Sequence, residues 1–227
     1  MDCPKCGSEV YCKDGTNGGR QRYLCKGCAY RYTVEKRAGT ADAETKRRAL
    51  QLYLEGMGLR SIGRLLGFSN VAVLKWIRGF GEKMEEIKSE TPVETMELDE
   101  MHTYIGQKKN YCWIWIAVDR YGKRFVGCVL GSRGTETGRK LWDGVGDAAT
   151  GSVMTDYWKP YQEFVPVAQH IQSKAETFTV EGYNSLFRHF LARLRRKTKC
   201  YSKCKKMLEY SVKLLMAKRN GTLAILG

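Results

Sequence analysis

The sequence lacks the features that mark a membrane or secreted protein. No apolar run approaches the roughly 20 residues that a membrane-spanning helix needs. The first residues, MDCPKCGSEV, show no charged segment followed by an apolar one, as a secretion signal would. The chain also has no low-complexity tract and no internal repeat. We therefore expect a cytoplasmic protein built from ordinary globular domains.

Acidic residues are scarce relative to basic ones. The 227 residues include 24 Asp and Glu against 39 Lys and Arg, which gives a formal net charge of +15. A basic surface attracts polyanions, and because no membrane segment is present, nucleic acid is the expected partner. A chain of this length can hold one ordinary core together with one or two small modules.

Four of the nine cysteines form two Cys-x-x-Cys pairs, Cys3–Cys6 and Cys25–Cys28, separated by eighteen residues. In a cytoplasmic chain such pairs indicate a metal site rather than disulfides. The spacing is typical of a zinc ribbon, in which two tight turns present four thiolates to one structural Zn²⁺. A redox dithiol is the alternative, but it would need a single pair within a larger α/β domain. We predict a zinc ribbon over residues 1–38.

Residues 40–90 are predicted to form a helix-turn-helix domain, with an ordinary helical hairpin as the alternative. Thr40 and Asp42 can cap a first helix through AETKRRALQLYLEG, and a turn at GFS then separates LRSIGRLL from a helix that starts at Asn70. That last helix is expected to continue through GEKMEEIKSE. In DNA-binding units of this kind the second helix of the pair enters the major groove. The candidate DNA contacts are Ser69, Asn70, Ala72, Val73, Lys75, Trp76 and Arg78.

Residues 93–227 alternate between strand and helix patterns. The predicted strands are ETMELDEM, YCWIWIAVD, RFVGCVLG, GSVMTD and VPVAQHIQ, and EYSVKLLMAKRN is a terminal helix that would cover the sheet. The order is three meandering strands, helix, strand, helix, strand, helix. It predicts an α/β domain of ribonuclease-H-like plan, with a mixed five-stranded sheet and helices on its faces. The whole chain is therefore expected to be multidomain.

Three acids fall where this plan would bring them together. Asp99 and Asp156 are predicted at the ends of the first and fourth strands, which are adjacent in the plan, and Glu181 begins a late helix. Three carboxylates at one place would bind hard divalent cations, two Mg²⁺ or Mn²⁺ about 3.5–4 Å apart, that catalyse attack on a phosphodiester. Glu100, next to Asp99, is the strongest alternative acid.

A helix is predicted from Val180 to Lys197, with one apolar stripe and an opposite face that holds Glu181, Asn184 and Arg188. Read alone, that face could be an ordinary solvated surface. With the two aspartates placed beside it, Asn184 and Arg188 become candidates to hold a DNA phosphate near the metals. Further backbone contacts are predicted at Arg193, Arg195, Arg196 and Lys197.

These motifs, in this order, resemble the insertion-sequence-one family of bacterial and archaeal transposases. The resemblance spans essentially the whole chain and is most specific over residues 154–199, where MTDYW, HIQSK and VEGYN-SLFRHFLARLRRKT follow one another. It implies a DDE transposase that binds the terminal inverted repeats of its own element and carries out DNA strand cleavage and strand transfer. By position it implies Asp99, Asp156 and Glu181 as the triad and Arg188 as the basic residue seven positions after the glutamate.

Two other functions remain open at this stage. The zinc ribbon and helix-turn-helix could serve a DNA-binding regulator whose sheet domain only dimerises, or the same metals could serve a structure-selective nuclease without strand transfer. Because transposition needs two DNA ends held together, the resemblance implies a homodimer or higher homo-oligomer on double-stranded terminal-repeat and target DNA. The expected location is the prokaryotic nucleoid.

Overall fold

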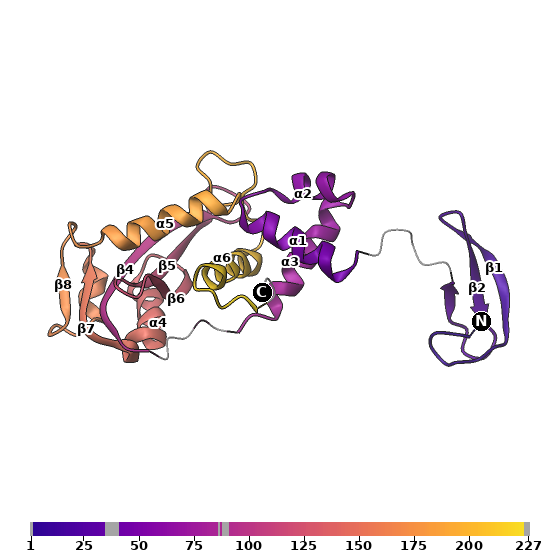
Figure 1. The fold of residues 1–227 in the computed structure, drawn as a ribbon, viewed down its shortest axis with the longest axis horizontal. Coiled ribbons are helices and arrows are strands. Elements are labelled where there is room, and N and C mark those ends of the chain that lie inside the picture. The colour runs from indigo at the N-terminus through magenta and orange to yellow at the C-terminus, as the bar shows by residue number, and fades with distance from the viewer. Residues whose placement is uncertain (1, 35–40, 86, 88–90, 225–227) are drawn as a thin grey trace. The chain divides into compact units, whose positions relative to one another are not determined.

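The computed structural model describes residues 2–34, 41–85, 87 and 91–224. The chain divides into two compact units, Met1–Asp42 and Ala43–Gly227, and each is described by itself (Figure 1). Thr40, one of the two predicted helix caps, lies outside the described residues. In the described part of the chain, no helix has the length and apolar character that a membrane crossing requires.

The first unit contains a small antiparallel sheet with strand order β1-β2-β3. Its strands are β1 (Tyr11–Asn17), β2 (Arg20–Cys25) and β3 (Arg31–Thr33). The buried apolar cluster of this unit consists of Cys3, Cys25 and Tyr32, with Tyr23 and Cys28 packed against it. So small a core stabilises little by apolar burial alone.

The second unit is built on a five-stranded mixed sheet with strand order β6-β5-β4-β7-β8. β4, β5 and β6 form an antiparallel meander, whereas β7 pairs in parallel with β4 and β8 pairs in parallel with β7. The number and order of the five predicted strands are therefore confirmed, and the first and fourth of them are neighbours. The fifth, predicted as VPVAQHIQ, is shorter, because only His170–Gln172 form a strand. The strands are β4 (Val93–Tyr104), β5 (Tyr111–Asp119), β6 (Arg124–Gly131), β7 (Ala149–Thr155) and β8 (His170–Gln172).

The prediction that Asp99 lies near the end of its strand is wrong. β4 continues to Tyr104 because its antiparallel pairing with β5 extends that far. The parallel ladder with β7 is shorter and ends with the pair Glu97↔Met154. Asp99 therefore lies in the middle of β4, two residues beyond its last pair with β7. Asp156 directly follows β7 at the same edge of this pairing.

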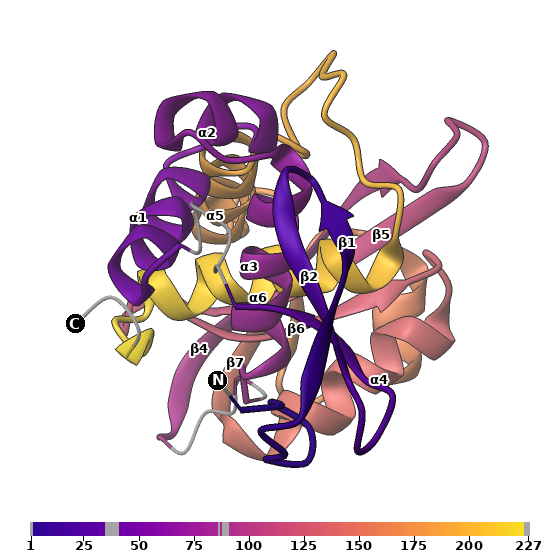
Figure 2. The same ribbon diagram turned by 90° about the vertical axis from the view of Figure 1, so that its right-hand side faces the viewer.

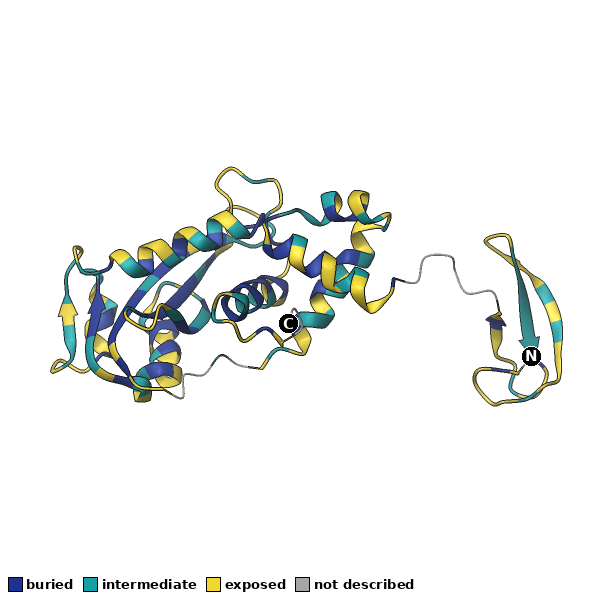
Figure 3. Cartoon of the chain, viewed as in Figure 1, coloured by how far each residue is buried: buried dark blue, intermediate teal, exposed yellow. Residues whose placement is uncertain are grey.

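Much of the sheet is buried (Figure 3), and the alternating side chains of its strands belong to two separate apolar clusters. In β5, Trp115 and Ala117 pack toward α4 (Thr135–Val145), while Ile114 and Ile116 belong to the cluster formed with α5 (Phe178–Phe190) and α6 (Lys205–Arg219). Short 3-10 turns, η1 (Gly146–Ala148) and η2 (Lys159–Glu163), complete the unit. α6 packs against β6, as expected for the terminal helix.

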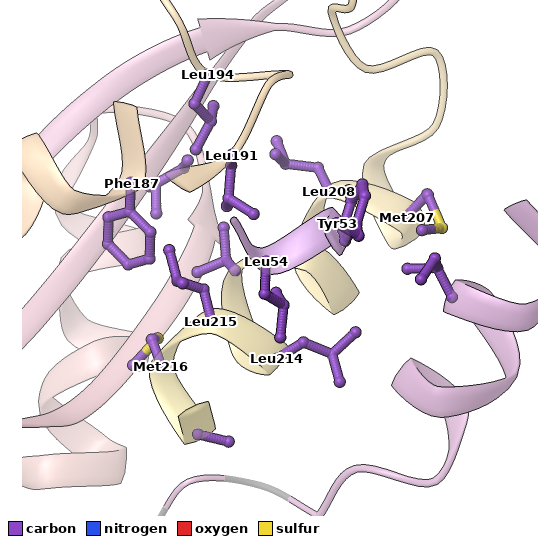
Figure 4. Close-up of a cluster of buried hydrophobic side chains, with 14 of the residues drawn as sticks. Tyr53, Leu54, Phe187, Leu191, Leu194, Met207, Leu208, Leu214, Leu215 and Met216 are labelled. Carbon is purple, nitrogen blue, oxygen red and sulfur yellow. The ribbon is translucent and has the colours of Figure 1, made fainter. Parts of the chain in front are cut away.

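The three helices α1 (Ala43–Leu54), α2 (Leu59–Leu66) and α3 (Asn70–Glu82) pack on the sheet domain through α6 (Figure 2). Tyr53 and Leu54 of α1 lie in the same apolar cluster as Leu208, Leu214 and Leu215 of α6 (Figure 4). In addition, the Tyr53 hydroxyl lies 2.7 Å from the Ser211 hydroxyl. The predicted domain boundary between residues 90 and 93 stays a prediction.

Two predicted helices end earlier than expected. α3 ends at Glu82, and the described residues that follow it are not helical, because two glycines near its end weaken the helix. α5 ends at Phe190 rather than Lys197. Residues 191–194 are all buried, which a helix with one exposed face cannot achieve, so the chain leaves the helix there and runs through the core.

Gly63 allows the close contact between α2 and the turn that precedes α3, since a Cβ on this residue would lie 2.5 Å from the Phe68 carbonyl oxygen. We expect Gly63→Ala to lower the free energy of unfolding by about 1–3 kcal/mol, as measured by urea denaturation. Gly79→Ala is the matched control, because a Cβ there meets nothing within 4 Å. It should raise stability by about 0.5–1 kcal/mol, and equal losses for both variants would contradict the prediction.

Candidate active site and cysteine cluster

A pocket of about 290 Å³ brings the three predicted acids together. Asp99 comes from the middle of β4, Asp156 directly follows β7, and Glu181 lies in the first turns of α5. The parallel pairing of β4 with β7 places the first two side by side. The lining residues are Asp99, Arg133, Asp156, Tyr157, Trp158, Lys174, Thr177 and Glu181.

Among the three pocket acids, Asp99 has surroundings that disfavour its charged form. Burial raises its pKa to about 7, and the charges of Glu100 and Asp156 act in the same direction. The Asn184 amide donates a hydrogen bond to Asp99 Oδ2 over 2.6 Å, which favours the charged form. The carboxyl group is therefore poised to ionise when a cation arrives.

Asn184 is placed to position Asp99 rather than to contact DNA. It is 4% exposed, and its Nδ2 is engaged by the aspartate. Its carbonyl oxygen Oδ1 has no hydrogen-bond partner among the described residues. Because an isolated buried acceptor is costly, this orientation is held by the short bond to Asp99. The predicted phosphate contact of Asn184 does not fit this burial.

The beginning of α5 is held by a buried glutamate that the sequence analysis did not assign. Glu97 Oε2 accepts a hydrogen bond from the Val180 backbone N–H over 2.8 Å, and Oε1 accepts one from Arg120 Nε over 2.6 Å. Arg120 also donates to the carboxylate and the backbone carbonyl of Glu176, just before the helix. Glu97 lies two residues before Asp99 on β4, so both side chains point to the same face of the sheet. This spacing is the sequence signal that could have indicated the role of Glu97.

Glu100, the alternative acid, points to the other face of the sheet. One of its oxygens accepts from the Tyr161 hydroxyl over 2.6 Å and the other from Arg133 Nε over 3.0 Å. Burial raises its pKa, while these two hydrogen bonds act against the rise. Glu100 does not line the pocket of Asp99, so both oxygens serve structural contacts instead.

The three pocket acids can provide oxygen ligands for a hard divalent cation, which is the ligand chemistry that Mg²⁺ and Mn²⁺ prefer. Among the described residues, however, their ligand atoms do not form a group within 4.8 Å of one another. Glu181 is exposed and free to change rotamer, whereas Asp99 is fixed by Asn184. The site therefore fits a metal that would draw the exposed Glu181 carboxylate toward the two aspartates.

Arg188 does not line the acidic pocket. It lies two turns further along α5 and lines a separate pocket of about 360 Å³ with His102 and Tyr104. The exposed basic residues of the chain that follows the helix share this second pocket: Arg195, Arg196 and Lys197. With Arg193, which also lines the pocket, five cations surround this concave surface, and such a surface is suited to the phosphates of nucleic acid.

Arg193 has a different environment from its basic neighbours. It is 8% exposed, its Nε donates to the Tyr53 hydroxyl over 2.7 Å, and its Nη1 donates to the Ser202 hydroxyl over 3.0 Å. These bonds join the segment after α5 to α1. The guanidinium is thus engaged in the core, which disagrees with its prediction as a DNA contact.

The candidate contact helix α3 presents one polar surface. Ser69 caps the helix, since its hydroxyl accepts from the Ala72 N–H over 3.1 Å. Of the predicted DNA contacts, four are exposed: Ser69, Asn70, Lys75 and Arg78. Trp76 is half-buried and meets Phe68 edge to face, and Val73 is fully buried, so its prediction as a contact is wrong.

In the first unit, the thiols of Cys3, Cys6, Cys25 and Cys28 lie within 4.8 Å of one another. The cross-pair sulfur distances Cys3–Cys28 and Cys6–Cys25 are both 3.6 Å. Four thiolates so arranged match the tetrahedral donor set of a structural zinc site. The predicted ligand cluster is therefore present.

The two cysteine pairs are held by equivalent backbone turns. Gly7 N–H donates to the Cys3 carbonyl just as Ala29 N–H donates to that of Cys25. Gly7 and Ala29 also share a left-handed backbone, with φ of 71° and 56°. An L-residue with a Cβ is strained in this region, so the backbone conformation of Ala29 in the second turn has a local energetic cost.

Comparison with known proteins identifies the family. Residues 93–220, more than half of the chain, match the family model described as IS1 transposase. The InsB protein of insertion element IS1 4 from Escherichia coli (strain K12) is 36% identical over 107 residues, which are 47% of this chain and 64% of that protein. The iso-IS1n InsB protein of Shigella dysenteriae is 32% identical over 107 residues, which are 82% of that protein. The chain belongs to the IS1 transposase family.

The alignment spans slightly less than two thirds of the Escherichia coli relative. Among solved structures, a chain of the simian T-cell lymphotropic virus intasome in complex with the PP2A regulatory subunit B56 gamma aligns with 57% of this chain and 54% of its own length. Its TM-score is 0.35 at 13% identity, too low for this likeness to support any argument about the site.

Ala29→Gly should relieve the strain of the second cysteine turn. We expect zinc affinity to rise by about 1 kcal/mol, or roughly fivefold, because glycine adopts positive φ without a steric cost. Competition with a chromophoric zinc chelator measures it. Gly7→Ala is the mirror-image control and should weaken zinc binding by a similar factor, since this position has φ of 71°. Unchanged affinity in both variants would show that the turns do not shape the site.

The raised pKa of Asp99 makes stability depend on pH when no divalent cation fills the pocket. The folded state binds this proton more tightly than an unfolded aspartate does. The resulting stabilisation is present below about pH 3.8 and is lost as the pH rises to about 7. In Mg²⁺-free buffer with zinc retained, urea unfolding should show Asp99→Asn gaining stability relative to the parent between pH 5 and pH 8. The exposed Asp143→Asn is the control, and parallel curves for Asp99→Asn and the parent would refute the assignment.

Proposed function

We propose that this member of the IS1 transposase family is a DDE transposase that cuts and joins DNA at the terminal inverted repeats of its own insertion sequence. The observation that carries the proposal is the shared pocket of Asp99, Asp156 and Glu181. These acids come from two adjacent parallel strands and the following helix of the matched region. The strand order and this placement support a ribonuclease-H-like catalytic domain.

Two Mg²⁺ or Mn²⁺ ions held by these carboxylates would activate the attacking oxygen and stabilise the leaving oxygen of a phosphodiester. Asn184 orients Asp99 through its 2.6 Å hydrogen bond, and Glu97 fixes the helix that carries Glu181. Asp99 would hold a cation in its ionised form, which the Asn184 hydrogen bond favours. Its fixed position lets the chain provide one preorganised ligand. Asp156, held by the Trp158 N–H, would be a second, and the exposed Glu181 side chain would adjust around them.

DNA binding is proposed for surfaces on both units. α2 and α3 would act as a helix-turn-helix, with Ser69, Asn70, Lys75 and Arg78 toward the DNA and Trp76 supporting the turn. A ribbon that holds one Zn²⁺ on its four cysteines would add a second contact. The basic pocket of Arg188, Arg195, Arg196 and Lys197 would follow the phosphate backbone near the cleaved bond. Arg193 also lines this pocket, but it is 8% exposed and is engaged by Tyr53 and Ser202, so it is not proposed as a DNA contact.

The proposed partners are the two ends of the element and the target DNA. Both ends must be held during transfer, so we propose a homodimer or higher homo-oligomer that works on the nucleoid of a prokaryotic cell. Sedimentation of the protein with and without terminal-repeat duplexes would report this assembly.

The triad assignment predicts that Asp99→Asn, Asp156→Asn and Glu181→Gln each lower cleavage by several orders of magnitude and bind the same DNA nearly as the parent does. The physical reason is the loss of a metal ligand without loss of the basic surface. The measurement is cleavage of a labelled duplex carrying the terminal repeat in Mg²⁺, next to its binding in Ca²⁺. Asp143→Asn, on the exposed side of α4, is the matched control. Full cleavage by all three variants would remove these acids from the site.

Strand transfer is tested separately with pre-cut ends. A transposase should join a pre-cut terminal repeat to a supercoiled plasmid, and the three variants should not. A nuclease without strand transfer would cleave the uncut duplex yet form no joined product. A regulator would bind the repeat and do neither.

A further inference from the structure

Arg133 forms a wall of the acidic pocket that no feature of the sequence indicated. It lies in the connection between β6 and α4, and its guanidinium sits between two indole rings. The Cζ atom is 4.7 Å from the ring centre of Trp113 and 4.0 Å from that of Trp158. Both rings attract the cation through cation–π contact, and together they limit where the guanidinium can move.

The same guanidinium is held from a third direction. Its Nε donates to Glu100 over 3.0 Å, and this carboxylate has a 1% exposed side chain whose other oxygen accepts from buried Tyr161. Trp158 in turn donates its backbone N–H to Asp156 Oδ1 over 2.9 Å. Arg133 and the pocket acid Asp156 are therefore positioned by the same tryptophan.

This restraint leaves part of the cation open to the pocket. The Arg133 side chain is 41% exposed, and its two Nη groups make no hydrogen bond within the described residues. It lines the pocket together with Lys174 and the three acids. An arginine that only neutralised Glu100 would not need a second aromatic face or exposure toward a pocket. A planar fork of free N–H groups is the arrangement that binds a phosphate through two parallel hydrogen bonds.

We propose that Arg133 binds a non-reacting backbone phosphate of the DNA strand that lies in the acidic pocket, next to the phosphate that is cleaved. This inference rests on the proposed function. The cleaved phosphate itself would be neutralised by cations on Asp99, Asp156 and Glu181, which leaves the Arg133 charge for its neighbour. The fixed guanidinium sets the register of the strand, because it loses little freedom when the phosphate binds.

The test replaces single phosphates by uncharged methylphosphonates, one at a time, on both sides of the cleavage site of a terminal-repeat duplex. One substitution should slow single-turnover cleavage by the parent ~10- to 100-fold. Arg133→Ala should show the same slowing on unmodified DNA and little further loss with that substitution. Arg133→Lys should recover only part of the rate, since lysine cannot stack or bind with two hydrogen bonds.

Two controls guard against a folding defect. Arg133→Ala combined with Glu100→Gln removes the unpaired buried charge and should behave as Arg133→Ala does, with cooperative thermal unfolding retained. Arg139→Ala, an exposed arginine on α4 outside the pocket, should keep the full sensitivity to the methylphosphonate. An Arg133→Ala variant that cleaves at the parent rate, or stays equally sensitive at every position, overturns the proposal.

Binding in Ca²⁺ separates this inference from the proposed chemistry. Arg133→Ala should lower the slope of log affinity against log salt by about one, and the critical methylphosphonate should produce no additional change. If the parent binds with this dependence but cuts nothing, the phosphate contact stands and the transposase proposal fails. If neither Arg133→Ala nor the methylphosphonate changes the affinity or its salt dependence, Arg133 is not a phosphate ligand.

Discussion

The geometry of the pocket depends on the hydrogen bonds that the buried Glu97 carboxylate accepts. It joins the middle of the sheet to the first turn of α5 through the Val180 N–H and to the end of β5 through Arg120. Its side chain is fully buried, so loss of Arg120 would leave a buried charge without a counter-ion, at a cost of about 3–5 kcal/mol. The helix that carries Glu181 cannot shift relative to β4 without breaking these bonds.

Strand alternation then gives two adjacent acids of β4 different tasks. Asp99 faces α5 and opens into the pocket, while Glu100 faces Tyr161 and Arg133 on the other side. One strand therefore contributes Asp99 to the pocket and, through Glu100, supports the opposite wall. Trp158 closes this arrangement, because it contacts both Arg133 and Asp156.

Much of this architecture follows from local patterns. The cysteine spacing predicted the thiol cluster, and apolar runs predicted the five strands, since both signals are carried by neighbouring residues. The burial of Arg193 depends on its contact with Tyr53, which lies far away in the sequence, and on Ser202, which the chain brings back after the end of α5. The role of Arg133 depends on two tryptophans from separate segments. No period or motif encodes such a meeting, so only the folded structure reveals it.

α5 also sets the distance between the acidic pocket and the basic pocket. Glu181 and Arg188 are seven residues apart on one helix, so a rise of about 1.5 Å per residue separates them by about 10.5 Å along its axis. B-form DNA advances about 3.4 Å per nucleotide in each strand, so this distance corresponds to about three nucleotide steps. Under the proposed function, the length of this helix would therefore set how many nucleotides lie between the cleaved bond and the phosphates bound in the basic pocket.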